Sequence, residues 1–323
     1  MEKSIIINRL FLGSSYRINN LYRNGAPWEI SVRLVNELYK VNNDISLYVV
    51  LPFNLDDTYI VKLAELFKEQ LNENINIYLE YNNEAWNPIF HGAKYVRHKG
   101  RIHNPEPDKN LYREGYKYYA YDAVRVFNIF NTRFPRIRTN RVLGSFQWNP
   151  HLTKGLLEYK NTHRSIDSIA IGTYFYMCFH SDKCKDDIGL DSFNNSNEIE
   201  EYLLSPDNRY SIPSLLKNIQ LHYDETSKYN VDLISYEGGL HITVQDLQHE
   251  DAEHFTKILN RFSDSEHAYS LYNIFLKGIK EQGLIDTWVA FTSPQTYHKW
   301  GPFGVKQTLN GTGPKYQAIM ENK

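Results

Sequence analysis

The sequence is poor in cysteine, with Cys178 and Cys184 as its only two in 323 residues. Two cysteines are too few for a framework of several disulfides, although a single disulfide remains an alternative if the protein is exported. The segment around the pair adds only His180, too few ligands for a structural zinc site. The other histidines do not fall at metal-binding spacing, so no metal site is expected.

Long apolar runs and an excess of one charge are also missing. No run approaches the length of a membrane span, and Asn8 and Arg9 interrupt the short apolar stretch near the N-terminus, unlike a signal peptide. These features predict a cytoplasmic protein with no membrane partner. The formal net charge of -2 gives the whole chain no basic field, so nucleic acid is not an expected partner. No phosphate-binding loop, dinucleotide fingerprint or Gly-x-Ser-x-Gly elbow occurs, so no cofactor is expected.

What the sequence does have is an alternation of short β-branched runs with longer amphipathic stretches, which is typical of β-α-β units on a parallel sheet. The expected strands cover residues 4–12, 45–52, 75–81, 141–147, 167–173, 231–237 and 285–291. The expected helices cover residues 28–41, 56–72, 114–133, 211–227 and 250–282.

The pattern predicts one α/β domain over residues 1–323, with an inserted polar loop or small subdomain around 178–210. The favoured architecture is a (β/α)8 barrel of the triosephosphate isomerase type. Because seven strands are expected rather than eight, the first strand would be missing or altered.

Two glutamates stand where apolar runs stop. Glu84 follows the strand at 75–81, and Glu237 is expected to end the strand at 231–237, before Gly238 and Gly239. Because the carboxyl ends of barrel strands face the active site, both side chains are expected in one cleft. Retaining glycoside hydrolysis needs such a pair, about 5 to 5.5 Å apart. Glu80, on the same strand as Glu84, is the competing carboxylate.

The segments EYNNEAWN (80–87) and YEGG (236–239) resemble motifs of the clan A retaining glycosidases. More narrowly, they are similar to the EYSNEVWN and YEGG pattern of a glycosidase-like family sometimes labelled cellulose-binding. The resemblance extends over most of the chain. It implies Glu84 as general acid/base, Asn83 as the ligand of the sugar 2-hydroxyl and Glu237 as nucleophile.

The same resemblance implies further substrate contacts. Tyr174 would lie near the nucleophile, and Trp288 or Trp300 would form a floor under the sugar ring. The resemblance also places a supporting arginine on the second strand, where Arg9 is the available residue, and Asn82 stands where the relatives have serine.

From the residues themselves, two further side chains are candidates. His241, four residues after Glu237, is a possible substrate contact, and Trp86 is a possible sugar platform. The loop at 292–304 has the glycine, proline and aromatic content of a substrate wall.

The resulting hypothesis is a retaining glycoside hydrolase for a β-linked oligo- or polysaccharide, with oligomeric state left open. Two alternatives remain: a catalytically inactive carbohydrate-binding barrel, and a barrel whose ligand is not a sugar.

Overall fold

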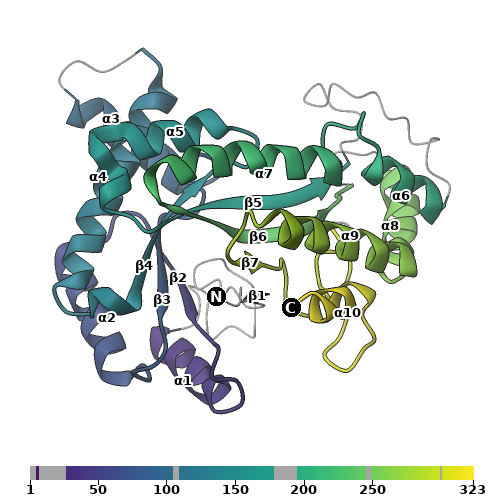
Figure 1. The fold of residues 1–323 in the computed structure, drawn as a ribbon, viewed down its shortest axis with the longest axis horizontal. Coiled ribbons are helices and arrows are strands. Elements are labelled where there is room, and N and C mark those ends of the chain that lie inside the picture. The colour runs from purple at the N-terminus through teal and green to yellow at the C-terminus, as the bar shows by residue number, and fades with distance from the viewer. Residues whose placement is uncertain (1–4, 7–26, 105–108, 178–194, 245–248, 299) are drawn as a thin grey trace. The chain divides into compact units, whose positions relative to one another are not determined.

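The computed structural model describes residues 5–6, 27–104, 109–177, 195–244, 249–298 and 300–323 (Figure 1). Its strands are β1 (Ile5–Ile6), β2 (Leu47–Leu51), β3 (Ile77–Tyr81), β4 (Thr139–Ser145), β5 (Ser168–Tyr176), β6 (Asp232–His241) and β7 (Trp288–Val289). The hydrogen-bonded order is β2, β3, β4, β5, β6 in a five-stranded parallel sheet, while β1 pairs with β7 in parallel.

Helices separate most of the strands. They are α1 (Trp28–Tyr39), α2 (Asp57–Gln70), α3 (His91–His103), α4 (Leu111–Asn131), α5 (Pro150–Glu158), α6 (Ser196–Leu204), α7 (Ile212–Thr226), α8 (His249–Ser263), α9 (Glu266–Gln282) and α10 (Pro314–Glu321). Within the described ranges, no helix is both long and apolar enough to cross a membrane.

The chain divides into two compact units. The first unit comprises Arg9–Ile171 and Asp224–Ile234, and the second comprises Met1–Asn8, Gly172–Tyr223 and Ser235–Lys323. Strands β5 and β6 therefore each begin in the first unit and end in the second.

In the first unit, α2 and α4 support the strand that leads to Glu84. Asp56 caps α2 by accepting a hydrogen bond from the Tyr59 amide at 2.8 Å. The Tyr81 hydroxyl, at the end of β3, donates to the buried carboxylate of Asp122 on α4. Arg125 Nε donates to the same carboxylate at 2.7 Å. Since a buried carboxylate needs such partners, this pair fixes the last residue of β3 against α4.

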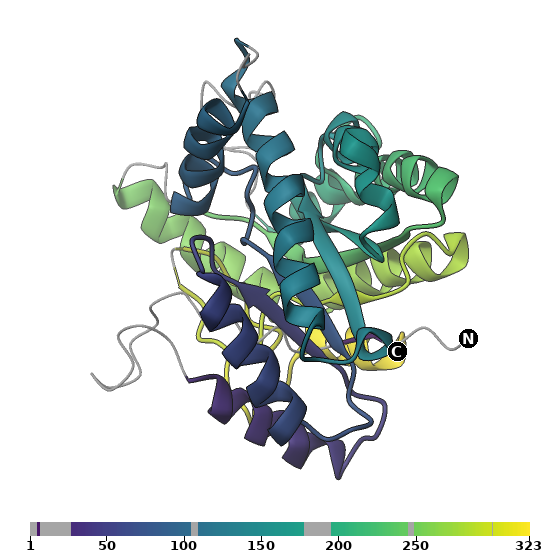
Figure 2. The ribbon, with the colours of Figure 1, turned by 90° about the vertical axis from the view of Figure 1, so that its left-hand side faces the viewer.

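Helices α3 and α4 of the first unit lie side by side (Figure 2), and glycines stand at their contact. A Cβ at Gly100 would collide with the Glu114 carbonyl, and one at Gly115 would lie 2.7 Å from Arg97 Cγ. The two helices therefore approach as closely as they do only because both positions lack a side chain.

In the second unit, β6 lies beside a largely aliphatic and aromatic core. Eight consecutive residues of this strand, 233–240, are buried, and Phe275 of α9 packs edge-on against Trp288 at 6.1 Å between ring centroids. Lys315 of α10 is fully buried, and its Nζ donates to the Pro302 carbonyl at 2.5 Å.

All seven expected strands are present, with altered ends, although residues 7–12 of the first lie outside the described residues. The expectation that Glu237 ends its strand was wrong, because β6 continues through both glycines to His241. The single helix expected over 250–282 is two helices, separated after Ser263. The expected loop at 178–210 contains α6, while residues 178–194, with both cysteines and His180, lie outside the described ranges.

Candidate functional site

The Glu84 end of β3 has an unusual backbone. Asn82 has φ 61° and Glu84 has φ 43°, so left-handed residues flank Asn83 on both sides. Asparagine tolerates this conformation better than most residues, which is a reason for Asn82 at this position. For a glutamate it costs free energy, on the order of 1 kcal/mol or more, and such residues cluster at functional sites.

Asn82 also fixes the direction of this turn. Its amide donates to the Leu51 carbonyl of β2 at 2.8 Å, and its Nδ2 donates to the Gly92 carbonyl of α3 at 3.4 Å. A Cβ on Gly92 would collide with Asn82 Oδ1. The strand end that carries Glu84 is thus joined to β2 on one side and to the first turn of α3 on the other.

The Glu84 side chain is half-buried, and its Oε2 accepts a hydrogen bond from Asn87 Nδ2 at 2.8 Å. The Asn87 amide donates to the Glu84 carbonyl at 2.8 Å, which closes a tight turn. Asn83 is also half-buried. Trp86 stacks on Phe146 with ring centroids 4.3 Å apart, so one face of this candidate platform is covered by protein.

Glu80, the competing carboxylate, is fully buried and accepts a hydrogen bond from the Tyr48 hydroxyl at 2.8 Å. A carboxylate without solvent exposure is less suited than Glu84 to exchange protons with water during turnover.

Glu237 lies within β6 and is 8% exposed. Its carbonyl accepts from the Ser235 hydroxyl at 3.0 Å and, more weakly, from the Thr173 hydroxyl at 3.5 Å. The Thr173 and Ser235 hydroxyls lie 2.8 Å apart, and Trp288 Nε1 donates to Thr173 at 2.8 Å. This chain of hydrogen bonds holds the backbone at Glu237 in one position.

The two glycines after Glu237 are required for close approach. A Cβ on Gly238 would collide with the Thr173 hydroxyl and lie 2.8 Å from Trp288 Nε1. Gly239 has φ 129°, a conformation that L side chains rarely adopt, and a Cβ there would collide with the Tyr272 hydroxyl. The strand can thus continue to His241.

An aromatic cluster follows at the carboxyl ends of β5 and β6. His241 lies 5.2 Å from the Tyr174 ring and 5.1 Å from the Phe303 ring, and Phe291 contacts both Tyr174 and Phe303. Burial lowers the pKa of His241, which favours the neutral ring. Tyr174 and His241 are therefore brought together as neighbours, and Phe291 and Phe303 are members that sequence reasoning missed.

The two candidate floor residues differ sharply. Trp288 is 3% exposed and uses its Nε1 for Thr173, so the structure argues against it as a sugar platform and makes it part of the core. Trp300 is 54% exposed. Arg9, the expected supporting arginine, lies outside the described residues.

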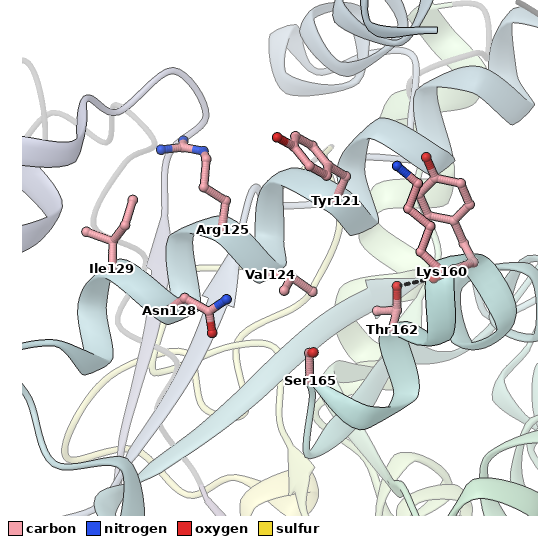
Figure 3. Close-up of a pocket in the computed structure, with 9 residues that line it drawn as sticks. Tyr121, Val124, Arg125, Asn128, Ile129, Lys160, Thr162 and Ser165 are labelled. Carbon is pink, nitrogen blue, oxygen red and sulfur yellow. Dashed lines mark hydrogen bonds between the residues drawn. The ribbon is translucent and has the colours of Figure 1, made fainter.

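A pocket of about 440 Å³ lies elsewhere in the first unit, between α4 and the short 3-10 helix η2 (Tyr159–Arg164) (Figure 3). Figure 3 shows Arg125 and Tyr121 reaching out from α4, with Lys160 and Ser165 on the facing segment. No candidate site residue lines it. In the part of the chain that the structure describes, no group of three or more histidine, cysteine or acidic residues is placed to hold a metal ion.

No protein-family model matches the sequence, and neither does any curated protein. Among solved structures, the chain is similar to the catalytic core of a xylanase A, with 13% identity, a TM-score of 0.50, and coverage of 93% of this chain and 84% of that one. It is also similar to a thermostable mutant of the xylanase Xyn10A from Cellvibrio japonicus, with 13% identity, a TM-score of 0.51, and coverage of 93% and 83%. At this identity the likeness shows the fold alone. The (β/α)8-barrel fold class expected from the sequence is confirmed.

Proposed function

We propose that this chain is a retaining glycoside hydrolase that acts on a β-linked oligo- or polysaccharide, with Glu84 as general acid/base and Glu237 as nucleophile. The observation that carries the proposal is where these carboxylates stand: one just after β3 and one in the carboxyl-terminal half of β6, in the fold class of the xylanases. In that fold class, strand ends on this side carry catalytic residues.

The reaction follows from the chemistry of two carboxyl groups. Protonated Glu84 gives its proton to the glycosidic oxygen while ionised Glu237 attacks the anomeric carbon, so the bond to the leaving sugar breaks as the glycosyl ester forms. Glu84 then takes a proton from water, which attacks the same carbon and releases Glu237. No metal or cofactor is needed in either step.

The neighbouring residues fit supporting roles in this reaction. Asn83 would hold the 2-hydroxyl of the sugar, and Trp300, which is 54% exposed, would contribute to the floor under the sugar ring. Tyr174 and His241 would line the nucleophile side, where a neutral His241 can accept or donate one hydrogen bond without adding charge. Trp86 would present its remaining face to the substrate.

Covalent trapping tests this proposal directly. Incubation with a panel of 2-deoxy-2-fluoro glycosyl fluorides should add one fluoroglycosyl mass to the intact protein, and peptide mapping should place it on Glu237. A folded protein that takes up no label, but binds oligosaccharides, would instead support an inactive carbohydrate-binding barrel. Absence of both would favour a ligand that is not a sugar.

A further inference from the structure

Helix α3 carries a row of basic side chains that the proposed reaction does not use. His91, Lys94, Arg97, His98 and Arg101 recur at helical spacing and define what we call the α3 basic stripe. Residues three and four apart lie on one face, about 5 to 6 Å from each other, so the stripe is about 15 Å long. The sequence has no acidic residue between Glu84 and Glu106. The stripe is thus a concentrated positive region on a chain of net charge -2.

The two permanent charges at the surface of the stripe, Lys94 and Arg101, have no carboxylate partner among the described residues. Arg97 is half-buried and lies over the Tyr112 ring at 4.8 Å. Glu114 of α4 is buried and pairs with Lys117 at 2.7 Å rather than with the stripe.

The fold does not depend on the most exposed of these charges. The opposite face of α3 carries Gly92, Val96 and Gly100, which are buried. That face packs closely against α4. Lys94 and Arg101 are exposed, so their charges are available to a ligand without disturbing the packing of α3 against α4.

We propose that the α3 basic stripe binds an anionic polysaccharide, and that the substrate of the hydrolase proposed above carries carboxylate or sulfate groups. This inference rests on the proposed function. The stripe lies close to Glu84: α3 begins seven residues after it, and Asn82 Nδ2 donates to the Gly92 carbonyl in the first turn of α3. A polymer bound at Glu84 would therefore pass near the start of the stripe.

Other polyanions fit less well. A membrane surface is usually bound by a helix with a continuous apolar face for insertion. In α3, Ala93 and Val96 are buried, and the exposed apolar side chains Ile89, Phe90 and Ile102 stand at the two ends of the helix rather than along one face. Nucleic acid is usually bound by a broad positive surface. In this protein the basic residues of the stripe lie on one helix face, and the net charge of the whole chain is -2, so nucleic acid is the poorer fit. A flexible acidic glycan needs only a short row of cations.

The test compares two polymers with the same backbone. At low salt, the protein should bind carboxymethyl cellulose at least tenfold more tightly than neutral hydroxyethyl cellulose. Affinity electrophoresis measures this as the slower migration of the protein in a gel that contains the polymer. Lys94→Gln/Arg101→Gln should lose most of that preference, about five- to tenfold, and 0.5 M NaCl should remove it. The matched control is Lys62→Gln/Lys68→Gln, which removes two exposed charges from α2 and should change binding less than twofold.

Equal binding of both celluloses, or equal behaviour of the two double variants, would overturn the inference. So would tighter stripe-dependent binding of a DNA duplex or of phosphatidylserine vesicles than of carboxymethyl cellulose. A neutral aryl β-glycoside separates this inference from the proposed function: both double variants should cleave it with unchanged kcat/KM. If the wild type cannot cleave it or take up the fluorosugar label, the proposed function fails, whatever the result with the charged polymer.

Discussion

The segments that carry Glu84 and Glu237 are held in place by different means. Around Glu84, the first unit uses left-handed backbone at Asn82 and Glu84, and a charged pair behind Tyr81. Around Glu237, the second unit uses glycines and a chain of buried hydroxyl groups. Glu84 is half-buried, whereas Glu237 is 8% exposed.

This difference suits the two roles we propose. A general acid/base must exchange protons with water once per turnover, so partial exposure and a polar turn are appropriate. A nucleophile has to meet one carbon atom at a fixed position, and a buried, immobilised strand provides that. The comparison can be tested by treating the two segments in parallel.

The largest expected effect is the loss of kcat/KM when either carboxylate is replaced. Its dependence on the leaving group of the substrate distinguishes the acid from the nucleophile. Glu237→Gln should lower kcat/KM at least a thousandfold with any aryl β-glycoside, because the attacking group is gone. Glu84→Gln should lose about 10²- to 10⁴-fold with a poor leaving group such as phenol, but far less with 2,4-dinitrophenol, which leaves without protonation. Steady-state kinetics with both substrates measures this. Equal losses of Glu84→Gln on the two substrates would reject Glu84 as the acid.

The next comparison is the loss of stability on replacing two glycines, Gly238, which follows Glu237, and Gly92, which contacts Asn82 near Glu84. Gly238→Ala should destabilise the protein by about 2 to 4 kcal/mol, because its Cβ meets the Thr173 backbone and side chain and the Trp288 indole. Gly92→Ala should cost about 1 kcal/mol or less, since the Asn82 side chain can move and alanine favours helix. Urea unfolding of both variants checks the order, and a larger loss for Gly92→Ala would contradict it.

A smaller loss of stability is expected when a hydrogen bond that supports either segment is removed. Thr173→Val leaves Trp288 Nε1 and the Ser235 hydroxyl without this partner and should cost about 1 to 3 kcal/mol. Tyr81→Phe should cost about 1 kcal/mol, because Asp122 keeps its bond from Arg125. Chemical denaturation gives both values. Thermal unfolding with and without a bound oligosaccharide would show whether either variant also weakens ligand binding.

The last effect is the change of stability with pH that a buried charge causes. In the first unit, buried Asp122 is paired with Arg125. In the second unit, the Lys315 ammonium donates to the Pro302 carbonyl and lies 4.5 Å from the centre of the Tyr297 ring. Burial lowers the pKa of Lys315 to about 7, against the attraction of Asp264. The unfolded chain therefore binds more protons than the folded protein between pH 7 and about 10.5, and stability should rise with pH in that window.

The rise expected from Lys315 is at most about 1.4 kcal/mol per pH unit. Lys315→Met should remove this slope, because its side chain keeps the length of the lysine but has no titrating group. Free energies of unfolding at pH 7, 8 and 9 for both proteins are the measurement. A slope that persists unchanged in Lys315→Met would assign it to another group.

Sequence reasoning located the strands well because strands buried on both faces are continuous apolar runs. It missed α3, where Gly92 and Gly100 interrupt the apolar period and basic residues fill the outer face. It also missed the short helices α5, α6 and α10. The break between α8 and α9 has a local signal in Asp264 and Ser265, residues that favour helix starts, which periodicity alone overlooks.

The candidate site was accessible from sequence only in part. The motifs named Glu84 and Glu237, but no local pattern encodes the contacts of Asn82 with β2 and α3 or the left-handed backbone at Asn82 and Glu84. Trp288 was a reasonable platform candidate until its indole was found on Thr173, which lies 115 residues earlier in the chain. The aromatic partners Phe291 and Phe303 depend on the same kind of distant pairing.

The division of the chain also bears on how such a protein can be inherited or dissected. Because the chain passes between the units after residues 8, 171, 223 and 234, neither unit is a contiguous stretch of coding sequence. One crossover between genes could not exchange a whole unit, and no simple truncation isolates one.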